Sequence, residues 1–203
     1  MSFINGAIND EGFAIIEKVI DEPTAAQLIA ALERVEDDGE SVRRRGGVYA
    51  IRNLVEAVPM VREFANSRAA RSLIEPVLGA RCFVVRSLLL DKTPEANWKV
   101  AWHQDLSIAV RERVEAEGFS AWSEKAGVIH VQPPVEILER MLTLRVYLDE
   151  CNEENGPLRV IPGSHLAGRL NAEQIREWRE TRTAVTCVVP CGGALLMKPL
   201  LLH

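Results

Sequence analysis

Apolar residues recur at helical spacing in the first 80 residues of the chain. In residues 23–38 polar residues fill the gaps between the apolar positions Ala25, Leu28, Ile29 and Leu32. Pro23 suits the first turn of this helix, because the N–H group that proline lacks would have no partner there. A pair of helices is predicted for residues 58–79, and the glycine at its end is typical of a helix C-terminus.

From residue 81 the pattern changes to β-branched and apolar runs bounded by turn residues. One helix interrupts them, since Asn171 and Gln174 have the spacing of a capping box at its start. The predicted strands are residues 81–91, 100–105, 141–150, 158–161, 184–190 and 194–203.

Residues 106–140 lie between two predicted strands and are too many for a simple hairpin. A connection of this length in a compact domain is more often a lid or a binding loop than a linker. Helices first and antiparallel strands afterwards indicate a mainly β domain with N-terminal helices, in the α+β sense. We expect a single domain over residues 1–203, with a helical buttress in residues 1–80 and the β core in residues 81–203.

Composition narrows the class of protein. The 203 residues are 47% hydrophobic and 26% charged, as in an ordinary globular protein, and the net charge is −5. We therefore expect no nucleic-acid partner and no membrane surface, since either favours a clustered excess of Lys and Arg. Four scattered cysteines and no apolar run of membrane-spanning length lead us to expect a cytoplasmic protein.

The chemistry suggested by the sequence centres on His103 and Asp105. On a strand, side chains two residues apart share a face, so these two project together while Trp102 and Gln104 project the other way. An imidazole and a carboxylate can supply two adjacent ligands to a divalent metal. With a second histidine they would form the facial set of non-haem Fe(II) oxygenases, which leaves three positions open. Alone, the pair is a weak signal, because a His and an Asp also form ordinary surface hydrogen bonds.

Longer motifs add to this pair. The stretches DKTPEANWKVAWHQD and LRVYLDECNEENGPLRVIPGSH are followed by a glycine turn and an apolar run ending in His. In this combination the chain resembles the phytanoyl-CoA dioxygenase family of Fe(II)/2-oxoglutarate-dependent oxygenases. The resemblance implies a double-stranded β-helix, which is a cupin-like jelly roll, with Fe(II), 2-oxoglutarate as cosubstrate and O2.

Two histidines are candidates for the third ligand. His203 follows the glycine turn and an apolar run, and the resemblance implies that it is the distal iron ligand. His165 is the alternative, although its position in the family usually carries a histidine that does not bind iron. We expect His130 to have a structural role, with a place in the substrate pocket as the alternative.

The resemblance also implies an Arg on a final strand, about ten residues after the distal histidine, that pairs with the C5 carboxylate of 2-oxoglutarate. The sequence ends at His203, so we expect either that it is truncated or that the gene product has lost its final strand, in which case another cation takes this role. Lys92 and Arg145 are the candidates, and each has an alternative as a solvated residue or as the partner of a nearby carboxylate.

The expected activity is therefore hydroxylation of a small organic substrate with release of succinate and CO2, by a monomer or weak homodimer. Asp105 favours hydroxylation, since halogenating relatives carry a small residue at this position. Two alternatives stay open. One is a jelly-roll domain that binds a small molecule at an incomplete iron site, and the other is a cupin-like metal enzyme that needs no 2-oxoglutarate.

Overall fold

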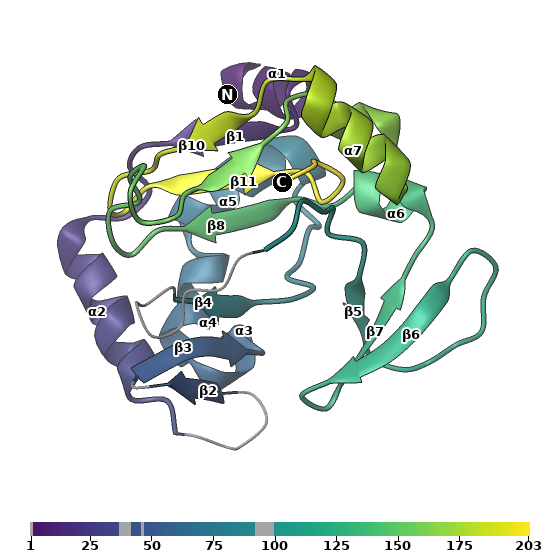
Figure 1. The fold of residues 1–203 in the computed structure, drawn as a ribbon. Coiled ribbons are helices and arrows are strands. Elements are labelled where there is room, and N and C mark those ends of the chain that lie inside the picture. The colour runs from purple at the N-terminus through teal and green to yellow at the C-terminus, as the bar shows by residue number, and fades with distance from the viewer. Residues whose placement is uncertain (1, 37–41, 46, 92–99) are drawn as a thin grey trace.

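The structure is a computed structural model that describes residues 2–36, 42–45, 47–91 and 100–203. Its main sheet is antiparallel, with three strands in the order β1 (Phe13–Ile16), β11 (Ala194–Met197) and β8 (Thr143–Val146). A second antiparallel sheet pairs β9 (Leu158–Val160) with β10 (Val185–Cys187). The first strand of the chain thus pairs with the last one (Figure 1).

The central strand β11 is buried on both faces. Leu195 and Met197 contribute to an apolar cluster that includes Val160 of β9 and Cys187 of β10, so this cluster fills the space between the two sheets. Leu196 projects to the other face. Side chains alternate along a strand, and a strand covered on both sides must therefore be apolar at every position. This explains the unbroken run ALLM in the sequence.

Helices α1 (Ser2–Asp10) and α5 (Arg68–Leu78) cover the outer face of the main sheet. Ile8 and Leu73 pack there with Ala14 of β1 and Leu196 of β11. Burial of this apolar surface, rather than helix propensity, is the main source of stability for short helices such as these.

Helix α2 (Glu22–Glu33) is the helix predicted for residues 23–38, although it ends at Glu33, and it packs beside the main sheet. Its N-cap is Asp21, whose carboxylate accepts a hydrogen bond of 3.0 Å from the backbone N–H of Thr24. Ala25, Leu28 and Leu32 are buried as expected, whereas Ile29 is exposed and the expectation for it is wrong.

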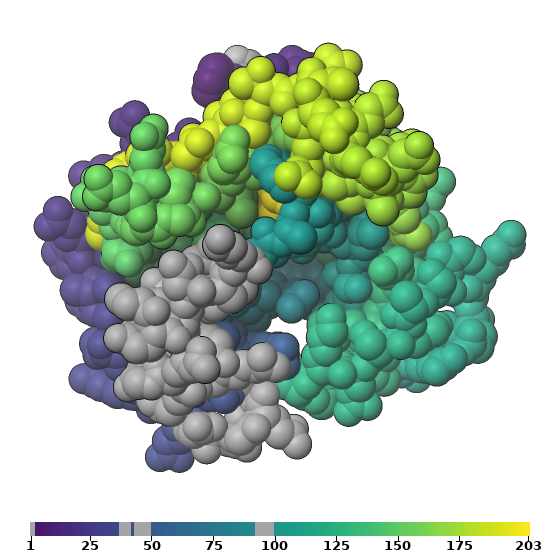
Figure 2. All heavy atoms as spheres, in the orientation of Figure 1, coloured from purple at the N-terminus to yellow at the C-terminus, as the bar shows by residue number. Residues whose placement is uncertain are grey.

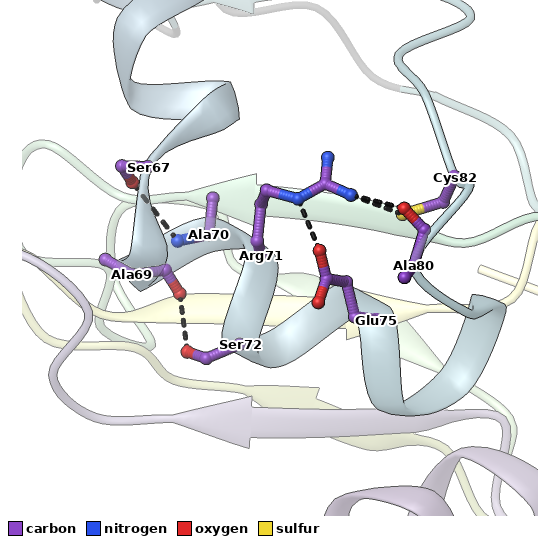
Figure 3. Close-up of polar contacts among 8 residues, drawn as sticks. All are labelled: Ser67, Ala69, Ala70, Arg71, Ser72, Glu75, Ala80 and Cys82. Atoms are coloured by element: carbon purple, nitrogen blue, oxygen red, sulfur yellow. Dashed lines mark hydrogen bonds and ion pairs between the residues drawn. The ribbon is translucent and has the colours of Figure 1, made fainter.

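The predicted helical pair is confirmed as α4 (Pro59–Asn66) and α5, which ends at Gly79. Figure 3 shows the polar contacts of α5. Ser67 caps its N-terminus, and Arg71 forms an ion pair with Glu75 one turn further on. The same guanidinium donates a 2.8 Å hydrogen bond to the carbonyl of Ala80 and therefore ties the end of the helix to the chain that follows.

Two smaller antiparallel sheets lie below the main one in Figure 1. One has the order β2–β3–β4, with α3 (Leu54–Ala57) after β3, and the other has the order β5–β7–β6, followed by α6 (Val135–Glu139). Their strands are β2 (Val42–Arg45), β3 (Gly47–Arg52), β4 (Leu88–Leu90), β5 (Ile108–Val110), β6 (Ser120–Lys125) and β7 (Val128–Gln132).

These sheets correct three expectations. The first 80 residues are not only helical, because they also contribute β1, β2 and β3. Residues 106–140 are not an open loop, since all three strands of one small sheet and α6 come from them. The strand predicted for residues 81–91 shortens to β4, and Phe83 before it is 81% exposed.

The C-terminal part follows the prediction more closely. Helix α7 (Ala172–Thr181) has the predicted capping box of Asn171 and Gln174, and a short 3-10 helix covers Ser164–Ala167. The strand predicted to reach residue 203 is wrong, because β11 ends at Met197 and a turn follows. No helix among the described residues is long and apolar enough to cross a membrane.

The turn before β11 generates a stability prediction. Gly192 has φ +77°, and a Cβ there would lie 2.3 Å from the carbonyl oxygen of Ile20. We expect Gly192→Ala to lower the free energy of unfolding by about 2–4 kcal/mol, through left-handed strain and displacement of bonded backbone. Gly127→Ala is the matched control, with φ +69° and open space around the new methyl group. Gly127→Ala should lower the free energy of unfolding by only about 1 kcal/mol, as measured by urea denaturation. Equal losses in the two variants would contradict the argument.

Candidate active site

Two reciprocal backbone hydrogen bonds bring His103 and His203 together. The N–H of His103 donates to the carbonyl of His203 at 2.8 Å, and the N–H of His203 donates to the carbonyl of His103 at 3.0 Å. Residues that exchange both bonds in this way face each other in an antiparallel pair, with their side chains on the same side. The ring centroids are accordingly 4.4 Å apart.

Asp105 completes a group of three. Its N–H donates to the carbonyl of Pro199 at 2.8 Å, which holds this segment against the turn after β11. One ligand atom from each of His103, Asp105 and His203 lies within 4.8 Å of the other two. Among the described residues this is the only such group of His, Cys, Asp or Glu side chains. The structure thus assembles the three predicted residues, and their binding of a metal stays a prediction.

Hydrogen bonds set the tautomer of both imidazoles. Nδ1 of His103 lies 2.9 Å from the carbonyl of Ala101, and Nδ1 of His203 lies 2.8 Å from the carbonyl of Leu201. A carbonyl oxygen can only accept, so each Nδ1 carries the proton. Each Nε2 is then left with a lone pair, which is the form that binds a metal ion.

Burial also favours this neutral form. The pKa of His203 is lowered, mainly because burial disfavours the charged imidazolium, while Asp105 raises it and His103 lowers it. The side chain of His203 is 6% exposed, whereas that of Asp105 is 51% exposed and faces solvent. The cluster therefore has one buried side and one open side, which a ligand can reach. In the space-filling view the surface is hollowed next to residues 100–107, with the β6–β7 hairpin along the other side (Figure 2).

Gln104 is a residue whose role the sequence did not predict. Its buried amide nitrogen donates to the carbonyls of Gly168 at 2.8 Å and Leu200 at 2.6 Å, and its oxygen accepts from the N–H of Leu170 at 2.8 Å. Residues 100–107 form no regular strand, so that prediction is wrong. The predicted alternation still holds, because Gln104 and Trp102 pack inward while His103 and Asp105 project together.

The IPGSH motif holds the other side of the site. The Ser164 hydroxyl donates to the carbonyl of Ile161 at 2.7 Å and accepts from the N–H of Leu202 at 2.8 Å. Ile161 also bonds directly to the carbonyl of Leu202 at 2.9 Å. The residue before His203 is therefore fixed by two hydrogen bonds to this motif.

His165 is not part of the cluster. Its Nε2 lies 3.1 Å from the carbonyl of Asn9, to which it donates, and its ring packs against Gly12. Burial lowers its pKa. His130 is a buried residue of β7, and its Nδ1 donates to the carbonyl of Val128 at 2.9 Å. This hydrogen bond accords with the structural role expected for His130.

Of the two candidate cations for the cosubstrate, only Arg145 can be placed, because Lys92 lies outside the described residues. Arg145 is on β8, and its guanidinium stacks on the ring of Tyr147 at 5.2 Å. The Tyr147 hydroxyl is buried and finds no hydrogen-bond partner in the part of the chain that the structure describes. Burial raises the pKa of this hydroxyl to about 12, so the hydroxyl keeps its proton and can donate a hydrogen bond. The positive charge of Arg145 also lowers the pKa of His203.

The family model of phytanoyl-CoA dioxygenase (PhyH) matches residues 8–203 of the chain. The chain therefore belongs to the phytanoyl-CoA dioxygenase family, as the motifs predicted. It is similar to ectoine dioxygenase of Bordetella parapertussis, with 26% identity over 163 residues that cover 76% of this chain and 46% of that protein. It is also similar to L-proline trans-4-hydroxylase of Streptomyces griseoviridis, with 25% identity over 89% of this chain and 63% of that one. The chain spans about half the length of the ectoine dioxygenase that it matches.

Solved structures share the fold. The carbocyclase SnoK from nogalamycin biosynthesis superposes with a TM-score of 0.71 at 18% identity, over all of this chain and 76% of that one. EctD from S. alaskensis with bound Fe gives a TM-score of 0.67 at 17% identity, over all of this chain and 69% of that one. The predicted fold class, a cupin-like jelly roll with N-terminal helices, is confirmed.

Gln104 generates a prediction for the site. In Gln104→Ala two carbonyls and one N–H lose their partner inside the protein, and each unpaired buried group costs about 1–3 kcal/mol. We expect the free energy of unfolding to fall by about 3 kcal/mol or more, measured by urea denaturation. The control Gln27→Ala changes an exposed residue of α2 and should stay within about 0.5 kcal/mol of wild type. A neutral Gln104→Ala would contradict the clamping role.

Proposed function

We propose that this chain carries the catalytic site of an Fe(II)- and 2-oxoglutarate-dependent oxygenase that hydroxylates a small organic molecule and releases succinate and CO2. The observation that carries the proposal is the meeting of His103, Asp105 and His203 with ligand atoms within 4.8 Å. Membership of the phytanoyl-CoA dioxygenase family supports it.

The donor set fits Fe(II). Two neutral imidazole nitrogens and one carboxylate oxygen form the facial set of non-haem iron oxygenases and leave room for a bidentate cosubstrate and O2. When bound, the iron supplies the oxygen chemistry that no protein side chain can perform. Asp105 is a metal-binding residue in this proposal, and its presence favours hydroxylation over halogenation.

The protein has three tasks around this metal. The carbonyls of Ala101 and Leu201 hold the imidazoles in the metal-binding tautomer. Gln104 and Ser164 fix the two segments that carry the ligands. Burial of His203 keeps water from one side of the cluster. These residues position the metal ligands, and we propose no proton transfer by them.

For the distal carboxylate of 2-oxoglutarate we propose Arg145 together with Tyr147. The Arg145 guanidinium lies over the Tyr147 ring, and its charge lowers the pKa of His203. The buried Tyr147 hydroxyl has no hydrogen-bond acceptor among the described residues. A guanidinium and a hydroxyl together can donate to both oxygens of a carboxylate. Lys92 stays an alternative that the described residues do not address.

The names of the relatives accord with a small-molecule substrate, since ectoine dioxygenase and L-proline trans-4-hydroxylase are named for compounds of that size. One EctD structure was solved with 2-oxoglutarate and 5-hydroxyectoine. We further propose a cytoplasmic monomer or weak homodimer, and the four free cysteines support a reducing compartment.

Anaerobic titration with Fe(II) and 2-oxoglutarate tests the site through the weak visible charge-transfer band of the complex. His203→Ala should weaken Fe(II) binding by more than about 100-fold, since loss of a group that only orients a ligand already costs about 10–100-fold. His165→Ala is the matched control, and its Fe(II) affinity should equal that of wild type.

In aerobic assays Asp105→Ala should form no succinate, whereas wild-type rates in that variant would contradict the assignment.

The same titration separates the alternatives. Metal binding without the charge-transfer band would favour a cupin-like enzyme that needs no 2-oxoglutarate. A wild-type chain that binds no metal would favour a small-molecule binding domain.

The cosubstrate contact has its own test. Arg145→Gln should raise the dissociation constant of 2-oxoglutarate by about 10–100-fold at saturating Fe(II), as expected for loss of a charge-assisted hydrogen bond. Tyr147→Phe should raise it by about 5–10-fold, because the ring stays and only the donor is lost. Arg159→Gln is the control, since this exposed arginine of β9 stacks on Trp102 at 5.8 Å. An unchanged constant in Arg145→Gln would exclude Arg145 from this role.

A further inference from the structure

Helix α6 has only five residues, so its own hydrogen bonds cannot keep it folded. Among the residues that the structure describes, no side chain caps its N-terminus. Leu138 is buried, with 1% of its surface exposed. The last carbonyls of any helix have no partner within the helix itself. The place of α6 is therefore decided by contacts with distant parts of the chain.

Two cations make such contacts, one at each end of α6. Nη2 of Arg169 donates a 2.8 Å hydrogen bond to the carbonyl of Pro133, which lies just before the helix. Nζ of Lys198 donates a 2.8 Å hydrogen bond to the carbonyl of Glu139, the last residue of the helix. A positive charge at this end is also favoured by the helix dipole.

Both cations are partly buried. Nε of Arg169 is enclosed and has no hydrogen-bond partner in the described part of the chain. Burial lowers the pKa of Lys198, while the charge of Glu139 raises it. A charged group leaves water at a cost unless hydrogen bonds replace those to water. The bonds to the carbonyls of Pro133 and Glu139 therefore favour the observed positions of the two side chains.

The same cations belong to the segments that hold the candidate metal ligands. Arg169 stands between the two residues whose backbone groups bond the side chain of Gln104. Lys198 precedes Pro199, whose carbonyl accepts a hydrogen bond from the N–H of Asp105. Helix α6 and the ligand-bearing segments are thus held by the same two stretches of backbone, one before α7 and one after β11.

Helix α6 ends the segment that begins after Asp105. This segment runs through β5, β6 and β7, and in Figure 1 α6 lies between α7 and the small sheet that these strands form. One end of the segment is joined to Asp105 and the other end is α6. A fixed α6 therefore determines where the sheet β5–β7–β6 lies beside the candidate site.

We propose that Arg169 and Lys198 are positioning residues that hold α6, and through it the sheet β5–β7–β6, in one place relative to His103, Asp105 and His203. A metal bound by these three side chains restrains the segments that carry both cations, and α6 is then steadied as well. The effect of the metal rests on the proposed function, whereas the two hydrogen bonds to α6 need no metal.

Hydrogen–deuterium exchange of the metal-free protein tests the two hydrogen bonds. Arg169→Met keeps a long apolar side chain and loses the donor, so amide exchange in residues 133–141 should be at least about 10-fold faster than in wild type. Lys198→Met should speed the same exchange by about 3-fold, since its hydrogen bond is more exposed. Exchange in β8 and β9 should stay at the wild-type rate in both variants.

Two further variants separate positioning from a general loss of stability. Arg169→Lys should bring the exchange back towards the wild-type rate, because an ammonium group can donate to the Pro133 carbonyl. Arg176→Met changes an exposed arginine of α7 and should exchange as wild type does. If Arg169→Met does not fold, Lys198→Met decides the question.

The effect of the metal is measured in the same way. Anaerobic addition of Fe(II) and 2-oxoglutarate should slow the exchange of residues 133–141 in wild type by about 5-fold or more, the lower end of ordinary coupling between sites. This slowing should be absent in Arg169→Met.

The outcomes that overturn the proposal are distinct. Wild-type exchange of residues 133–141 in both methionine variants would exclude the two cations from this role. Equally faster exchange in β8 and β9 would overturn it too, because that pattern is a general loss of stability. A charge-transfer band without slower exchange of α6 in wild type would exclude the effect of the metal. If no band forms, the proposed function fails, and the metal-free comparison still decides whether Arg169 and Lys198 hold α6.

Discussion

The pair of backbone hydrogen bonds between His103 and His203 is the constraint on which the candidate site depends. Each bond by itself contributes only about 0.5–1.5 kcal/mol, so the pair cannot hold two segments together without support. The support comes from polar side chains that bond the same backbone. Gln104 holds the turn at Leu200 from one side, and Ser164 holds Leu202 from the other.

Apolar burial then makes this arrangement stable. The turn after β11 carries Leu200, Leu201 and Leu202, all of which are fully buried. Three consecutive leucines hold this turn in place by packing. Leu201 joins the cluster between the sheets, whereas Leu202 packs with Ile161 near α7. Packing within the jelly roll therefore fixes a turn that no local sequence motif would hold in place.

The arginines whose charges act near the site come from two parts of the fold. Arg145 projects from the main sheet, where the Tyr147 ring covers its guanidinium. Arg86 comes from the chain before β4, on the side of the small sheets. Asp105 lies within the electrostatic reach of Arg86, and His203 lies within that of Arg145.

By itself the sequence determined the features that neighbouring residues encode. The caps of α5 and α7, the strands β8 and β9, the shared face of His103 and Asp105, and the family all followed from residues close together in the chain. Only the tertiary structure shows that His203 lies beside His103 and Asp105 whereas His165 lies elsewhere, because that arrangement depends on pairing between distant segments. It also revealed the clamp at Gln104 and the small sheets in residues expected to be helix or loop. Hydrogen bonds across long sequence distances leave no periodic pattern in either segment, so only the folded chain shows which carbonyl each buried donor reaches.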